Sequence, residues 1–228
     1  MDLEGIARVF SGYSYLTLNF RSPRAGALAL TPLLGLPITL TPVIATGRIA
    51  ADDFALFFGP HALRLDVSFR LGEAAFISLP VPQDAGMDVV AVGVVSAFSY
   101  GSVDQGLPLC EVTLKSGEET VETLWLESGV TTARADYDFH SHGYEKHEKI
   151  TVIESIQADY LNVDGVPFMK HKYAALLEVQ VPAAHIDAIA FRATSDVILD
   201  IYDVALLDAP APEDSPLRPA ENDHRRGE

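Results

Sequence analysis

The sequence predicts an all-β protein in which two sheets pack face to face. Apolar and polar residues alternate with a period of two along most of the chain, which is the pattern of strands that bury one face. The predicted strands are short, follow one another at intervals of about 8 to 12 residues, and are separated by turn sequences rather than by helices. Together these observations predict a jelly-roll-like β-sandwich with additional N-terminal strands and a disordered C-terminal tail.

Length and composition are compatible with one large folded domain. The chain has 228 residues, of which 48% are apolar and 21% are charged, so it can bury a sizeable core. Its formal net charge of −16 produces an average field that repels phosphate backbones. Nucleic acid is therefore not a predicted partner.

We predict an N-terminal arm at residues 1–26, a β-sandwich domain at 27–208 and a disordered tail at 209–228. The tail is rich in proline and charge, so ordering it would cost entropy without burying large apolar groups. The sequence PVPQDAG, residues 80–86, marks a sub-boundary within the sandwich domain. The first residues do not have the basic and apolar regions of a secretory signal, and the compartment is otherwise not indicated.

The stretch from residue 26 to residue 47 is apolar enough to suggest a membrane span. It contains three prolines, each of which removes a backbone donor and disfavours helix in the residue before it. We therefore predict short strands at 27–31 and 36–41, and membrane association through residues 27–47 is the alternative.

The clearest strands lie in the middle and near the end of the chain. In residues 62–71 every second residue is apolar, and residues 173–181 and 196–207 repeat this alternation. Residues 87–98 are apolar on both faces and rich in valine, which predicts a central strand covered on both sides. Further strands are predicted at 53–58, 75–79, 108–115, 119–126, 131–138, 149–158 and 186–193.

Four stretches also carry a resemblance to a known group of domains: VVAVGVVSAFS, VDQGLPLCEVTLKSGEETVETLWLESGVTTARADYDF, YAALLEVQVPAAHIDAIAFRA and LDIYDVALLD. Over about residues 88–208 the sequence resembles uncharacterised bacterial jelly-roll domains of the galactose-binding-like type, some of which are attached to membrane proteins that handle surface polysaccharides. The resemblance implies a sandwich of roughly eight strands and suggests glycan binding or a structural role. It implies no catalytic residue.

The polar segment RADYDFHSHGYEKHE, residues 134–148, contains three histidines. In an extended backbone His140 and His142 leave the same face, and His147 can return after the turn at Gly143 to complete three nitrogen ligands for a divalent metal. The other motifs of a cupin-type metal enzyme are missing, and a solvated polar loop is the alternative interpretation. The sequence indicates no other cofactor.

Carbohydrate binding requires an exposed aromatic face flanked by side chains that hydrogen-bond to hydroxyl groups. Trp125, the only tryptophan, lies inside a predicted strand, where we expect it to pack in the core, and the only cysteine, Cys110, is expected to be buried and unreactive. The predicted ligand-binding residues lie instead beside predicted loops and are Tyr100, Asp104, Tyr137, Asp138, His142 and Tyr144.

These patterns favour a non-catalytic binding module for carbohydrate or for a partner related to surface polysaccharides. One alternative is a structural jelly-roll assembly protein of a surface layer or virion, which would form oligomers through protein contacts. The other is a metal-dependent β-barrel enzyme that uses His140, His142 and His147. Motifs for an activated serine or a phosphate-binding loop are missing, so no catalytic residue is predicted.

Overall fold

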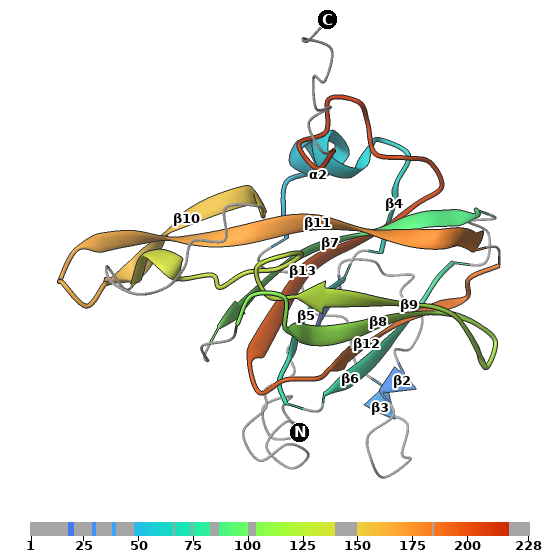
Figure 1. Ribbon diagram of the computed structural model, residues 1–228, viewed down its shortest axis with the longest axis horizontal. Coiled ribbons are helices and arrows are strands. Elements are labelled where there is room, and N and C mark those ends of the chain that lie inside the picture. The colour runs from blue at the N-terminus through green and yellow to red at the C-terminus, as the bar shows by residue number, and fades with distance from the viewer. Residues whose placement is uncertain are drawn as a thin grey trace, which may run out of the picture.

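The structure, a computed structural model, describes residues 48–65, 67–73, 75–82, 87–99, 104–139, 150–183 and 185–218, together with strands at 18–20, 29–30 and 38–39. Figure 1 shows two layers of strands, with one helix on the outer side of the larger sheet. The predicted all-β sandwich is confirmed.

Eight strands form the sandwich: β5 (Val67–Leu71), β6 (Phe76–Pro80), β7 (Val89–Ser99), β8 (Pro108–Ser116), β9 (Glu119–Glu127), β11 (Pro167–Ala183), β12 (Ala188–Ala193) and β13 (Ile198–Leu207). The larger sheet contains the order β5-β13-β7-β11, and the smaller sheet has the order β6-β12-β8-β9. If these eight strands are numbered 1 to 8 along the chain, the larger sheet has the order 1-8-3-6 and the smaller sheet has the order 2-7-4-5. This interleaved antiparallel order is that of a jelly roll.

Other strands extend the larger sheet or pair with each other. β1 (Leu18–Phe20) pairs with β5, and β4 (Leu63–Arg64) pairs with β13. β10 (Thr151–Leu161) pairs with β11, whereas β2 (Ala29–Leu30) and β3 (Ile38–Thr39) pair with each other. Within the ranges that the structure describes, no helix has the length and apolarity needed to span a membrane.

The core is built as the alternation predicts. Val67, Phe69 and Leu71 of β5 are all buried between the two sheets. β7 is the central strand predicted to be covered on both sides: Val92 and Val94 belong to the core between the sheets, whereas Val95 belongs to a second cluster under the helix. Residues on both sides of the sub-boundary predicted at 80–86 contribute to the same core, since β6 and β7 lie in opposite layers of one sandwich.

The prediction of a strand at 53–58 is wrong, because these residues belong to the helix α2 (Ala51–Phe58). Phe54, Phe57 and Phe58 are spaced to share one helical face, and all three are buried. Acidic residues in the first turn suit the positive end of the helix dipole. The apolar run is too short for periodicity to separate a helix from a strand.

Two other segments differ from their predictions. Residues 131–138 do not form a continuous strand; Thr132 and Arg134 form isolated bridges, and the segment leads into the 3-10 helix η2 (Tyr137–Phe139). The predicted disordered tail is structured as far as residue 218: the buried Ser215 hydroxyl donates a 2.6 Å hydrogen bond to the carbonyl of Phe57, and Arg218 Nε donates to the carbonyl of Ala211. Residues 219–228 lie outside the described part.

Cys110 is fully buried in the core, and burial raises the pKa of its thiol to about 12. Because the thiolate is the reactive form, we expect the native protein to react negligibly with a thiol reagent at mildly alkaline pH and to react fully after unfolding in urea. A Thr123→Cys variant, with the new thiol on the exposed face of β9, is the positive control. Rapid labelling of Cys110 in the native protein would contradict its burial.

Candidate functional site

Trp125 lies on β9, the edge strand of the smaller sheet, and points out of the sandwich. Its side chain is 38% exposed, whereas its neighbours Leu124 and Leu126 are buried. Because adjacent strand residues point to opposite faces, the two leucines that fill the core place the tryptophan on the surface. The expected core packing of Trp125 is therefore wrong.

Trp125 is the end of a row of side chains that crosses the smaller sheet. The register places Trp125 opposite Glu111 of β8, Glu111 opposite Arg192 of β12, and Arg192 opposite Phe76 of β6. Residues directly opposite one another share a face of the sheet. We call this row of four residues the Trp125 face; its three interstrand spacings separate the two aromatic residues by about 14 Å.

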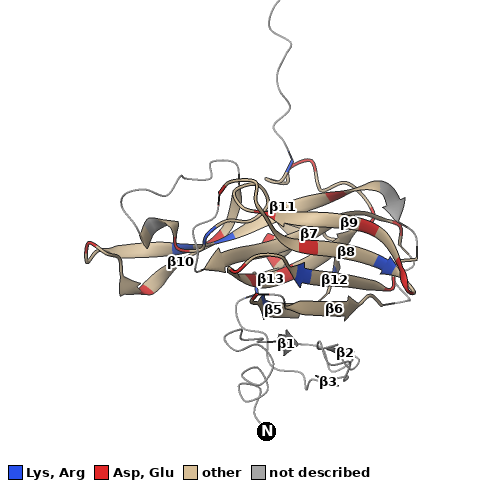
Figure 2. Cartoon of the chain, turned by 60° about the horizontal axis from the view of Figure 1, so that its bottom comes forward, with Lys and Arg blue, Asp and Glu red and all other residues tan. Residues whose placement is uncertain are grey.

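The centre of the Trp125 face is an ion pair. The Arg192 guanidinium pairs with Glu111 Oε2, while the hydroxyl of Thr113 donates a 3.2 Å hydrogen bond to Glu111 Oε1. The Arg192 side chain is 57% exposed, so its remaining donors can reach a ligand. Figure 2 shows acidic and basic residues scattered along β8, β9 and β12 and none on β6. The face thus combines two aromatic residues with a few fixed charged groups.

The described members of the predicted ligand set lie elsewhere. Asp104 is exposed in the turn before β8, and Tyr137 of η2 packs in a cluster with Ala97 and Tyr173 of the larger sheet. Burial raises the pKa of Tyr137 to about 12. For Asp138 the structure describes only the backbone, in η2. The other predicted residues lie outside the described part and are Tyr100, His140, His142, Tyr144 and His147.

The metal site predicted from the three histidines therefore falls on residues that the structure does not describe. Among the residues that it does describe, no cluster of three or more histidine, cysteine, aspartate or glutamate side chains could hold a metal ion.

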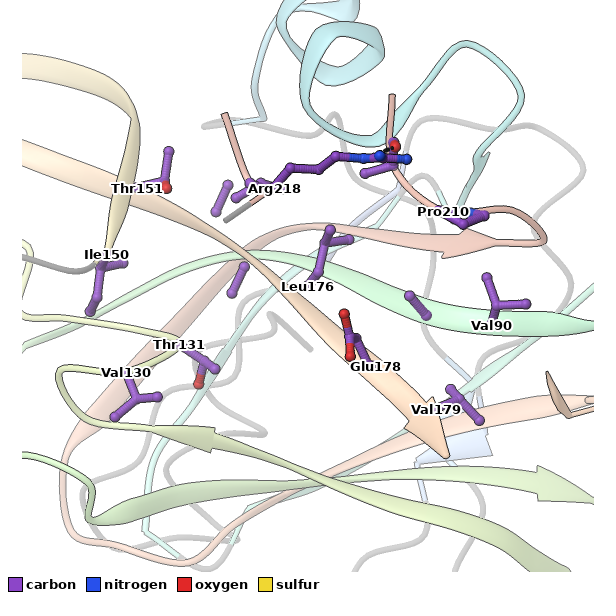
Figure 3. Close-up of a pocket in the computed structure, with 15 residues that line it drawn as sticks. Val90, Val130, Thr131, Ile150, Thr151, Leu176, Glu178, Val179, Pro210 and Arg218 are labelled. Atoms are coloured by element: carbon purple, nitrogen blue, oxygen red, sulfur yellow. Dashed lines mark hydrogen bonds between the residues drawn. The ribbon is translucent and has the colours of Figure 1, made fainter. Parts of the chain in front are cut away.

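A second surface feature lies along the free edge of β11. Strand β10 pairs with β11 only between Pro167 and Ala174, and β11 then continues along β7 with its other edge unpaired by a described strand. A cavity of about 720 Å³ opens over this edge. We call it the edge groove, and Figure 3 shows its lining.

The walls of the edge groove come from distant parts of the chain. Val130 and Thr131, from the turn after β9, form one side, and the C-terminal segment with Arg218 forms another. Leu176 of β11 lies between them. None of the residues that line the groove is aromatic. The groove is thus mainly apolar, and it provides no ring on which a sugar could stack.

The fold and the Trp125 face define the class of protein: a jelly-roll β-sandwich with an exposed aromatic and charged surface on its smaller sheet. No protein-family model matches the sequence, and no curated protein has a significantly similar sequence.

Proposed function

We propose that the protein is a non-catalytic carbohydrate-binding module whose ligand lies on the Trp125 face. The observation that carries this proposal is the position of the partly exposed Trp125 in one row with Phe76 and with the Glu111–Arg192 ion pair on the outer face of the smaller sheet. An exposed indole can pack against the C–H groups of a sugar ring. The carboxylate of Glu111 and the guanidinium of Arg192 can accept and donate hydrogen bonds to sugar hydroxyls.

The shape of the face favours an extended glycan over a single sugar. The four residues lie across four antiparallel strands, with an aromatic residue at either end of the row. A chain of several sugar units could lie across the strands and stack on Trp125, while Phe76, whose ring is partly buried and has Lys115 Nζ 5.9 Å from its centroid, forms the other end of the row. The formal net charge of −16 disfavours strongly acidic polysaccharides, so neutral glycans are the proposed ligands. The resemblance to galactose-binding-like domains supports the same ligand class.

The single tryptophan provides a direct test. Because Trp125 is the only indole in the chain, a sugar that stacks on it should change the tryptophan emission of the whole protein in a saturable titration. A glycan array would first identify the oligosaccharide to be used. Replacing Trp125 by alanine is expected to weaken its binding about tenfold or more, since central aromatic contacts dominate binding energies.

Val152→Ala is the matched control, because Val152 is similarly exposed but lies on β10 of the other sheet. This variant should bind the oligosaccharide as the unmodified protein does. The proposal fails if no glycan on the array binds. It also fails if a glycan binds without changing the emission and with equal affinity for the Trp125→Ala variant.

A further inference from the structure

The hairpin formed by β10 and the first part of β11 projects beyond the sandwich, as Figures 1 and 2 show. Three apolar side chains at its end are more than half exposed: Leu161 at 56%, Val163 at 56% and Val166 at 52%. We call these three residues the hairpin tip. Apolar residues clustered at the end of a projection are typical of interaction sites rather than of a solvated loop.

The hairpin tip is held in a defined conformation. Asn162 Oδ1 accepts hydrogen bonds from the backbone N–H groups of Asp164 (3.0 Å) and Val166 (2.8 Å), which closes the turn. Behind the turn, the ring of Tyr160 packs edge-on against that of Phe168 with centroids 5.1 Å apart. A tip ordered in this way loses little conformational entropy when it binds.

The edge groove is the apolar concave counterpart of the tip on the same chain. The tip lies at the turn before β11, and the eight residues from Val166 to Ala174, where the lining of the groove begins on β11, correspond to about 26 Å of extended backbone. A hairpin tip therefore cannot reach the groove of its own molecule. It can reach the groove of a second molecule.

We propose that the hairpin tip of one copy of this protein inserts into the edge groove of the next copy. Apolar side chains then meet an apolar lining, and the free edge of β11 offers backbone hydrogen bonds to the inserted turn. The groove contains one basic residue, Arg218, and one acidic residue, Glu178, so Asp164, the charged residue of the inserted turn, would lie on the Arg218 side.

The contact is heterologous, so each copy would use its tip for one neighbour and its groove for another. Repetition would produce chains or rings, which is the behaviour of an assembly protein. A contact limited to one turn is smaller than a standard interface of about 1,200–2,000 Å², so single contacts should be weak. The formal net charge of −16 repels copies at long range, and salt should therefore strengthen the association.

Sedimentation velocity of the full chain at increasing protein and salt concentrations tests the proposal. The unmodified protein should show a sedimentation coefficient that rises with both. Two variants should remain monomeric at the same concentrations: Val163→Asp in the tip, and Val130→Asp in the groove, both at exposed positions where folding does not depend on the apolar side chain.

Mixing the two variants is the decisive step. The tip variant retains an intact groove and the groove variant retains an intact tip, so an equimolar mixture should form one-to-one dimers and nothing larger. Trp125→Ala, on the other sheet, should associate like the unmodified protein, because this proposal does not depend on carbohydrate binding. The proposal is overturned if the unmodified protein stays monomeric, if either variant alone still associates, or if the mixture contains no dimer.

Discussion

Replacing Asp203 by asparagine is expected to lower the free energy of unfolding by about 3–5 kcal/mol. Asp203 lies on β13 and is fully buried, where Arg64 Nε donates a 2.8 Å hydrogen bond to its Oδ1. Arg48 Nη2 lies 3.5 Å from the same oxygen. The substitution keeps the shape of the side chain but removes the charge, so the Arg64 guanidinium loses its carboxylate in an environment that hydrates it poorly.

The ion pair of Asp200 with Arg70 provides a control on the same strand. Arg70 Nε lies 2.6 Å from Asp200 Oδ1, but the Arg70 side chain is 43% exposed, so Asp200→Asn should cost only about 0.2–1 kcal/mol. Urea denaturation monitored by circular dichroism measures the free energy of unfolding of both variants. Arg64→Met, alone and combined with Asp203→Asn, completes a double-mutant cycle in which the combined loss should be smaller than the sum of the single losses. If Asp203→Asn and Asp200→Asn lower the free energy of unfolding by the same small amount, burial does not determine how much these ion pairs contribute to stability.

The second large effect is expected at the contact between α2 and the larger sheet. Phe58 is buried against Gly93 of β7, and replacing it by alanine should lower the free energy of unfolding by about 3–5 kcal/mol. The cost has two parts: the lost burial of the ring, and the cavity left between helix and sheet. Leu56→Ala is the matched control, because Leu56 lies on the exposed side of the same helix. Leu56→Ala should lower the free energy of unfolding only slightly.

Gly93 allows the same contact to be tested from the sheet. A Cβ atom at this position would lie 2.5 Å from Phe58 Cδ1, so Gly93→Ala should cost about 1–3 kcal/mol through overpacking. In the Phe58→Ala background the methyl group enters the space that the ring has left. Gly93→Ala should then cost much less, with the remaining cost set by the Ala205 Cβ atom at 3.1 Å, as thermal unfolding would show. An equal cost in both backgrounds would mean that the ring does not occupy this position.

The sequence was sufficient to predict most strands because alternation records which side chains face the core. The predicted ranges 75–79, 108–115 and 119–126 correspond closely to β6, β8 and β9. Alternation does not record which strands are neighbours, since a face can be buried by many pairings. The strand order therefore had to come from the structure.

The errors have identifiable physical causes. Five of the six residues at 53–58 are apolar or aromatic, which suits a strand by composition, and only the spacing of Phe54, Phe57 and Phe58 indicates a helix. The segment after residue 208 contains few large apolar groups, yet hydrogen bonds such as that from Ser215 to Phe57 hold it against α2. Composition does not detect anchoring of this kind.

The candidate surfaces differ in how far the sequence could predict them. The alternation of Trp125 with Leu124 and Leu126 indicates that its side chain is exposed, whereas the general tendency of tryptophan to be buried favours the core. The edge groove cannot be predicted from the sequence. Its lining combines residues near 130, 150, 176 and 217, which only the tertiary structure brings together.

The positions of the last two strands have a consequence for synthesis of the protein on the ribosome. β12 joins β6 to β8 in one layer, and β13 joins β5 to β7 in the other. A nascent chain that ends before residue 188 consequently holds each layer as two separate pieces with open strand edges. Such a chain would expose these edges until β12 and β13 emerged, and the sheets would close late because contacts between residues so distant in sequence form slowly.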